Sequence, residues 1–295
     1  MLSLKSPMQR MRVRIPLFLF ALFAATHGHA QDIGTVTLLR DTPLRVLRGV
    51  SVLQGAEGMR LRPGDFLVTG STATAQAQLE LSGGAIVEIG PSSEVYLFSV
   101  TASGAEIVLA RGWLKGEATS GSYRYSNPLV SAASKGGNVL LRADDNEADV
   151  FVEQGVAQVS GGSAPIPTAA DKIFFTRRAG KPIAVAGRPS AEFVGAMPIS
   201  FRDVLPPRLE RFAGKKAPEP RNDHEVSFAD VEPLLRLPVA WRRGLVERFR
   251  PRLQDQGFRQ AIEAHIASLP EWKPILYADN HTSGAAAPAD KSGPR

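Results

Sequence analysis

The fold is decided by residues 64–97, which read GDFLVTGSTATAQAQLELSGGAIVEIGPSSEVYL. In the middle of this stretch apolar residues alternate with polar ones: Ala75, Ala77, Leu79 and Leu81 against Gln76, Gln78, Glu80 and Ser82. Because side chains on a strand point alternately to its two faces, the pattern predicts a strand with one buried and one solvent-facing side. Gly83 and Gly84 supply the positive φ values of a tight turn, and Val87 resumes the buried face. The stretch therefore predicts a β-meander.

The same pattern of short apolar segments and turn residues continues along much of the chain. Short apolar segments from Pro43 to about Gly187 are separated by turn signals such as Pro63-Gly64, Ser103-Gly104 and Lys135-Gly136-Gly137. A last hairpin is expected from residues 173–175 and 183–185. Short strands with regularly spaced turns predict an all-β domain.

Four motifs in this region resemble those of the FecR-like domain. They are Gly64-Asp-x-Leu-x-Thr-Gly70, the hairpin Gly83-Gly-Ala-Ile-Val-Glu-Ile-Gly-Pro-Ser-Ser93, the strand Ala105-Glu-Ile-Val-Leu-Ala-Arg-Gly-Trp-Leu114 and the closing Asp149-Val-Phe-Val-Glu-Gln-Gly-Val-Ala-Gln-Val159. Ser82-Gly83-Gly84 departs from the Asp-Gly-Ser that is usual in the family turn. The resemblance covers about residues 45–160 and implies a solenoid-like or two-layered β-domain of successive hairpins. Well-known members are periplasmic regulators in iron-uptake signalling, with a cytoplasmic anti-sigma segment and a membrane helix before this domain.

The first 30 residues have the pattern of a secretory signal peptide. Lys5, Arg10, Arg12 and Arg14 precede a short apolar run from Ile15 to Ala25, and Gly28-His29-Ala30 ends the segment with small residues. The pattern predicts cleavage after Ala30 and a periplasmic or secreted protein, with no integral membrane segment after cleavage; an uncleaved anchor is the alternative. Since only 14 residues precede the apolar run, the family's anti-sigma segment is not expected here.

Charge and cysteine content exclude several functions. The chain carries 35 basic and 29 acidic residues, but four of the basic residues lie in residues 1–30, so the predicted mature chain has a net charge of only +2. An exported chain with so small an excess is not expected to bind nucleic acid. The absence of cysteine excludes disulfides, thiolate metal sites and a cysteine nucleophile.

The sequence changes character after the β-domain, which we place at residues 31–187. Prolines are frequent in residues 188–226 and predict a linker with one short helical piece near Phe201 to Phe212. Ser227 and Asp230 form a capping-box signature, and apolar residues then recur at helical spacing around Trp241, Leu245 and Phe249, and again around Phe258 and Ile262. Residues 227–277 are therefore expected to form a small helical unit, followed by a disordered tail at 278–295.

No group of residues indicates a catalytic or metal site. His224, His265 and His281 are scattered, and the acidic run Asp144–Asp149 lacks the spacing of a calcium-binding loop, so a solvated turn is the preferred interpretation. Glu80 and Glu88 lie on neighbouring strands and are the best available pair of carboxylates, but sheet alternation alone explains their positions. We predict no cofactor and no metal.

The best candidates for a binding surface are aromatic and basic. Tyr123 and Tyr125 share one strand face, where exposed rings would stack on sugars or anchor a partner. Arg242 and Arg243 begin a basic run that would contact an anionic envelope polymer or an acidic partner, with a solvated helix face as the alternative. These features favour a non-enzymatic exported protein that binds a partner protein or an envelope polysaccharide, in envelope signalling or assembly. The alternative is a carbohydrate-active enzyme built on a β-solenoid, which clustered carboxylates on one sheet face would favour.

Overall fold

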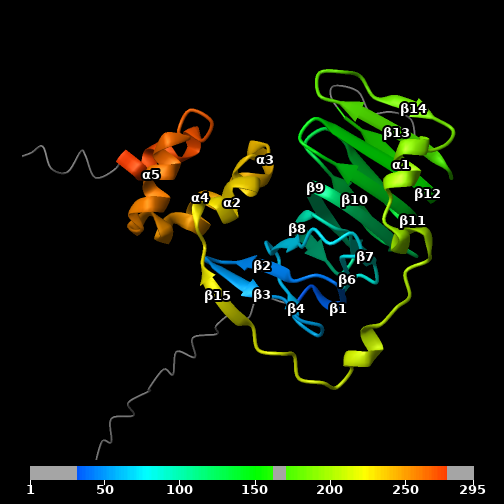
Figure 1. Cartoon of the computed structure of the whole chain (residues 1–295), viewed down its shortest axis with the longest axis horizontal. Helices are drawn as coiled ribbons and strands as arrows, with labels where there is room; N and C mark the ends of the chain where they lie inside the picture. Colours follow the sequence, from blue (N-terminus) through cyan, green and yellow to red (C-terminus); the bar gives the residue numbers. More distant parts are fainter. Residues whose placement is uncertain (1–31, 162–170, 278–295) are drawn as a thin grey trace, which may run out of the picture. The chain divides into compact units, whose positions relative to one another are not determined.

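A computed structural model describes residues 32–161 and 171–277 of the chain. It is mainly β, as predicted, with a small helical part near the C-terminal end of the described chain (Figure 1). The strands are β1 (Gly34–Arg40), β2 (Leu44–Arg48), β3 (Ser51–Gln54), β4 (Arg60–Leu61), β5 (Phe66–Thr69), β6 (Gln76–Leu81), β7 (Ile86–Ile89), β8 (Glu94–Thr101), β9 (Gly104–Ala118), β10 (Ser122–Ser126), β11 (Ser131–Ala143), β12 (Glu147–Ser160), β13 (Ile173–Arg178), β14 (Ala184–Ala186) and β15 (Arg221–Glu225). The helices are α1 (Ala191–Ala196), η1 (Ile199–Arg202), η2 (Leu209–Phe212), α2 (Phe228–Leu235), α3 (Val239–Arg242), α4 (Leu245–Phe249), η3 (Arg250–Gln254), α5 (Gln256–Ala264), η4 (Pro270–Trp272) and α6 (Lys273–Tyr277). The predicted signal peptide and C-terminal tail lie outside the described residues.

The strands form two layers that share β9, β11 and β12. The first layer has the order β15-β3-β2-β5-β8-β9-β10-β11-β12. The second layer has the order β4-β1-β6-β7-β9-β11-β12-β13-β14. Nearly all neighbours are antiparallel and the hairpins follow one another along the chain, which agrees with the two-layered form of the prediction.

Each shared strand passes from one layer to the other at glycine. In β9, residues 104–108 pair with β10 whereas residues 112–118 pair with β11, and Gly112 at the junction has φ +96°. A Cβ at Gly112 would lie 2.3 Å from the Ser93 hydroxyl oxygen, so no larger residue fits. In β11 and β12 the change occurs where Gly137 pairs with Gly155, both at positive φ. Lys135-Gly136-Gly137, predicted as a chain reversal, is therefore a bend inside a long strand.

The turn predicted at Gly83-Gly84 is present, with one difference. The Gly84 amide donates to the Leu81 carbonyl oxygen at 2.9 Å, which closes the turn between β6 and β7. Only Gly84 takes a positive φ, at +84°, so the expectation for Gly83 is wrong. A Cβ on Gly83 would instead lie 2.8 Å from the Tyr123 hydroxyl oxygen, so Gly83 is small because a core side chain reaches it.

Apolar residues of both layers fill the space between them. This core includes Val46, Leu67, Val95, Ile107, Leu79, Val87, Leu114, Val139 and Val150. Tyr123 and Tyr125 belong to the same core, each only 1% exposed, which corrects the prediction that they form a surface pair. The Tyr123 hydroxyl donates to the Gly83 carbonyl oxygen at 2.6 Å, and the missing side chain of Gly116 makes room for the Tyr125 ring. The two tyrosines therefore tie β10 to the opposite layer.

The helices from α2 to α6 pack on the outer face of the first layer. Leu47, Phe66 and Tyr96 of the strands share one apolar cluster with the helical residues Phe249, Ile262 and Trp272. The Ser227–Asp230 capping box is confirmed at the start of α2. The predicted middle helix is broken at Gly244 into α3 and α4. Trp241 lies at the edge of the apolar cluster, and its indole N–H donates to the Glu106 carboxylate. No helix of the described chain is long and apolar enough to span a membrane.

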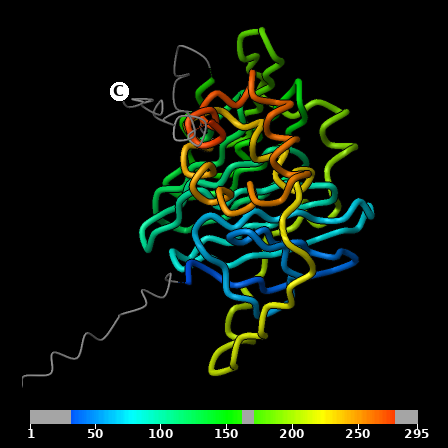
Figure 2. Tube along the Cα trace, turned by 90° about the vertical axis from the view of Figure 1, so that its left-hand side faces the viewer, coloured from blue at the N-terminus to red at the C-terminus, as the bar shows by residue number. Residues whose placement is uncertain are grey.

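The predicted proline-rich linker is instead a structured part of the fold. Phe193 of α1 and Phe201 of η1 pack on Trp113, Leu140 and Phe174, on the outer face of the second layer. Further along, β15 pairs with the edge strand β3 of the first layer. Figure 2 follows this course: the yellow chain runs past the blue strands before it enters the orange helices. The described residues fall in a single compact unit, so residues 188–226 do not separate two domains.

Trp272, not Trp241, is the indole on which the helical layer depends. Trp272 is fully buried, whereas Trp241 is half-buried. We expect Trp272→Ala to lower the free energy of unfolding by about 3–5 kcal/mol, because the truncation leaves a cavity in the layer. Trp241→Ala is the control and should cost clearly less in the same denaturant titration. Equal losses for the two variants would contradict this description of the helical core.

Candidate functional site

The outer face of the second layer carries a buried group of polar side chains, here called the polar face: Gln76, Gln78, Glu80, Glu88, Lys115 and Glu117. Strand register places Gln78, Glu88 and Lys115 side by side on β6, β7 and β9. Each of these three side chains is no more than 1% exposed. The polar side of strand β6, predicted to face solvent, is therefore buried.

The polar face is covered by residues 199–209, here called the returning segment. The Lys115 ammonium donates to the carbonyl oxygens of Phe201 and Asp203, at 2.9 and 2.8 Å. The Leu205 amide donates to the Glu117 carboxylate at 3.1 Å. Both signs of charge on the sheet are thus used to hold one stretch of main chain.

The same mode of contact continues to the end of the returning segment. The Gln78 side-chain amide donates to the Pro206 carbonyl oxygen at 2.8 Å. The amides of Arg208 and Leu209 donate to the two oxygens of Glu80, at 2.6 and 3.1 Å. In all, side chains of the sheet contact six backbone groups of the returning segment. Val204 in its middle is 76% exposed, whereas the side chains of Phe201 and Leu205 are buried, so the sheet holds the segment through backbone groups and through these two apolar side chains.

Lys115 is the electrostatic centre of the polar face. Besides its two carbonyl partners, its ammonium lies 3.1 Å from a carboxylate oxygen of Glu117 and 3.1 Å from one of Glu153. Burial raises the pKa of the neighbouring Glu88, and this effect outweighs the opposing influence of its polar neighbours and of Lys115. Glu88 is thereby shifted toward its neutral form, which lowers the cost of placing an acid under the returning segment.

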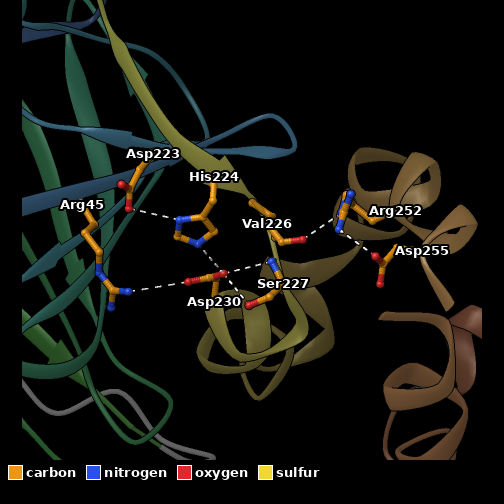
Figure 3. Close-up of polar contacts among 8 residues, drawn as sticks. All are labelled: Arg45, Asp223, His224, Val226, Ser227, Asp230, Arg252 and Asp255. Carbon is orange, nitrogen blue, oxygen red and sulfur yellow. Dashed lines mark hydrogen bonds and ion pairs between the residues drawn. The ribbon is translucent and has the colours of Figure 1, made fainter. Parts of the chain in front are cut away.

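A second polar cluster fastens β15 to the helices (Figure 3). The His224 ring lies between two carboxylates, with Nδ1 3.1 Å from Asp223 and Nε2 3.1 Å from Asp230. Asp230 also accepts from the Ser227 amide at 2.9 Å and lies 3.6 Å from Arg45 of β2. This cluster therefore joins the edge strand, the first layer and the N-terminus of α2.

In this cluster the pKa of His224 is raised and the pKa of Asp230 is lowered. The hydrogen bond to Asp230 is the main cause that raises the pKa of His224, and Asp223 adds to it. Burial acts to raise the pKa of Asp230, but hydrogen bonds from Ser227 and His224 outweigh it and lower the pKa. A charged imidazolium between two carboxylates is the form that this geometry stabilises.

The predicted site residues do not form one surface. Tyr123 and Tyr125 lie in the core, and Arg242 is buried with its guanidinium donating to the carbonyl oxygens of Leu235 and Ser268. Arg243 alone of the four is exposed. Elsewhere in the basic run, Arg248 donates to the carbonyl oxygens of Leu47, Gly49 and Gly64. Arg242, Arg248 and Arg252 therefore hold carbonyl groups within the fold, whereas Arg243 and Arg250 are exposed.

The acidic run forms the turn between β11 and β12. The Asp144 carboxylate accepts from the amides of Asn146 and Glu147, both at 2.8 Å. Asp149 is buried and accepts from the Thr176 hydroxyl at 2.7 Å. Within residues 32–161 and 171–277, no three histidine or carboxylate side chains are grouped as metal ligands would be.

The sequence pointed to only part of the polar face. Sheet alternation predicts Glu80 and Glu88 as neighbours, but it does not predict that Lys115 and Glu117 join them. Their signal was that charged residues alternate with Leu114 and Gly116 at the end of a strand otherwise rich in apolar residues. Nothing local indicated that residues 199–209 return to cover them.

Comparison with known proteins gives only distant matches. No family model matches the chain, and no curated protein matches it significantly. Among solved structures, two of a candidate anti-sigma factor from Parabacteroides distasonis ATCC 8503 are similar, with TM-scores of 0.38 and 0.37 and sequence identities of 12% and 13%. The matches cover 44% and 43% of this chain, and 63% and 61% of those chains.

The ammonium of Lys115 is expected to hold the returning segment in place. Lys115→Met removes the cation but leaves buried carboxylate and carbonyl oxygens without their partner, so we expect a loss of about 3 kcal/mol in the free energy of unfolding. Limited proteolysis should then cut near Val204 faster than in the unaltered chain. Glu153→Gln, at a partly exposed acid, is the control and should cost less. Unchanged stability and unchanged cleavage in Lys115→Met would rule out this role.

The His224 cluster is expected to make stability depend on pH. Because the pKa of His224 is raised in the folded state, its contribution is fully present below the ordinary value of 6.5 and is lost as pH rises through the raised pKa. Asp230 contributes above its ordinary value of 3.8 and loses that contribution as pH falls through its lowered pKa. His224→Gln, which cannot carry the charge, should therefore cost most near pH 5, by about 0.5 kcal/mol for such an exposed pair. Urea titrations at several pH values measure it, and the cost should become smaller in an Asp230→Asn background, where only Asp223 still pairs with the ring. A pH-independent cost would contradict the assignment.

Proposed function

We propose that this chain is an exported, non-enzymatic protein with a FecR-like β-domain that binds a partner protein. The motifs in residues 45–160 support the family assignment, and the basic and apolar pattern of residues 1–30 supports export to the periplasm. The observation that supports the binding function is that the two-layered sheet binds two segments of its own chain. It holds the backbone of the returning segment through Lys115, Glu117, Gln78 and Glu80, and it extends the first layer with β15.

These two contacts are physical modes by which β-proteins bind extended polypeptide. Addition of a strand to a sheet edge gives affinity through main-chain hydrogen bonds. Side chains that meet backbone groups give affinity with little dependence on the bound sequence. The returning segment already occupies the polar face, so addition of a strand to a sheet edge is the mode that we propose for a partner.

A protein partner is favoured over an envelope polysaccharide. Sugar recognition on a β-surface relies on exposed aromatic rings, and the candidates Tyr123 and Tyr125 lie in the core. Of the large hydrophobic side chains exposed in the described chain, Tyr277 alone is aromatic. The surface therefore offers little for stacking on sugar rings.

The enzyme alternative has one observation in its favour, the gathering of Glu80, Glu88 and Glu117 on one sheet face. A glycosidase needs two carboxylates that reach substrate and water. Here Glu80 and Glu117 accept hydrogen bonds from backbone amides of the returning segment, and Glu88 is fully buried. Catalysis would require the returning segment to leave the polar face, whereas addition of a partner strand at a sheet edge would not, so binding is the simpler function.

The test is to identify what the exported full-length chain contacts in its own cell envelope. A tagged chain is cross-linked in living cells, and the enriched proteins are compared with those from an unrelated exported protein carrying the same tag. We expect one or a few envelope proteins, and a purified candidate should bind the chain in calorimetry. N-terminal sequencing of the same material should begin at Gln31.

Two results would overturn the proposal. Co-sedimentation of the chain with purified envelope polysaccharide, without any protein partner, would indicate a glycan-binding protein. Release of reducing ends from such polysaccharide, lost in both Glu88→Gln and Glu117→Gln, would establish the enzyme alternative.

A further inference from the structure

An open groove lies between the end of the second layer and the short helix α1. One wall is formed by β14 with Phe174 and Thr176 of β13, and the other by Ala191, Val194 and Gly195 of α1. The groove has a volume of about 830 Å³, which is large enough for several side chains of a bound ligand. Val185 and Val194 line it and are 54% and 42% exposed, so its apolar walls face solvent.

One wall of the groove is an unpaired sheet edge. Among the described strands β14 pairs only with β13, through Phe174–Thr176, and ends the second layer. All three of its residues, Ala184, Val185 and Ala186, are exposed and uncharged. Proteins protect such edges by keeping them short, with charged side chains, with proline or by covering them. β14 is short, at three residues, but contains no charged residue and no proline. An exposed apolar edge beside an apolar groove is the arrangement that accepts an added strand.

The groove also has a charge preference. Arg188 and Arg202 line it and both are exposed, while its lining contains no carboxylate. The acid of α1, Glu192, faces Arg142 of β11 at 3.8 Å. A bound segment would therefore gain from a carboxylate placed near the two guanidinium groups.

We infer that this groove is the docking site for an extended, acidic segment of the partner protein. The segment adds to β14 as a further strand, places alternate apolar side chains between β14 and α1, and brings a carboxylate to Arg188 and Arg202. The inference rests on the proposed function, that the partner is a protein, and it names the surface and the chemistry of that contact. The carboxylate is either an acidic side chain or the C-terminus of the segment.

Gly195 allows the groove to be blocked without strain. A Cβ at this position meets no atom within 4 Å, and the backbone is not in the left-handed region, so Gly195→Phe should fold and fill the groove. Gly244→Phe is the matched control, because Gly244 is equally free of contacts and lies between α3 and α4, away from the groove. Thermal melting of both variants checks that each is folded.

The probe is a library of random linear peptides, displayed in one arm with a free C-terminus and in the other with a blocked one. We expect selected peptides to alternate apolar and other residues and to carry an acid, and to lose binding roughly tenfold or more in Gly195→Phe and in Arg188→Glu/Arg202→Glu. Gly244→Phe and Arg243→Glu should bind as the unaltered chain does. Hydrogen exchange should show that the peptide protects amides of β14, and the two arms decide which carboxylate is used.

The inference fails if no linear peptide is selected, or if selected peptides bind Gly195→Phe undiminished. A loss in Arg243→Glu instead would place the contact on the helical layer. These outcomes leave the proposed function intact when cross-linking still recovers a protein partner. Absence of any protein partner would remove the proposed function itself.

Discussion

The requirement that shapes this protein is that both outer faces of its two-layered sheet must be covered by the chain that follows it. The first layer exposes apolar residues outward, among them Leu47, Phe66 and Tyr96, and the helices α2–α6 bury them. The second layer presents Trp113 and Phe174 beside the polar face, and α1 with the returning segment covers both. Since the chain has no cysteine, all of this is held by packing and hydrogen bonds.

The second layer shows why the covering chain can be extended rather than helical. A helix satisfies its own backbone groups, so it suits an apolar face such as the outer side of the first layer. The polar face instead offers an ammonium, an amide and carboxylates, which the free backbone groups of an extended chain can satisfy. The returning segment begins with the short helix η1, and Pro206 and Pro207 keep the stretch between η1 and η2 from forming a regular helix or ladder. The proline content that suggested a linker therefore favours the irregular backbone by which this stretch covers the polar face.

Much of the fold was predictable because its signals are local. Alternation fixed the inner faces of β6 and β7, the Ser227–Asp230 box fixed the start of α2, and the turn at Gly84 followed from its glycine. The errors concern long-range partners. Alternation predicts which side chains share a face but not what covers that face, so Gln78 and Glu80 were assigned to solvent. For the same reason Tyr123 and Tyr125 were assigned to a surface. In the structure, glycines next to the two rings leave room for them in the core.

The remaining difference between prediction and structure concerns Gly136 and Gly137, which were predicted to form a turn but lie inside β11. Two glycines in a row predict a hairpin when each strand belongs to one sheet. In this fold β9, β11 and β12 instead serve both layers, and their glycines mark the crossing points. Because the two layers share these strands, they are joined on one side, and free edges remain at the ends of the strand order, among them β15 and β14. The chain covers β3 at one of these ends with its own β15, whereas the described chain places no strand on β14. The edge at β15 consists of exposed polar and charged residues, RNDHE, whereas the edge at β14 consists of exposed, uncharged ones, AVA. Charged side chains discourage the addition of a further strand, so of these two edges β14 is the one whose composition permits it.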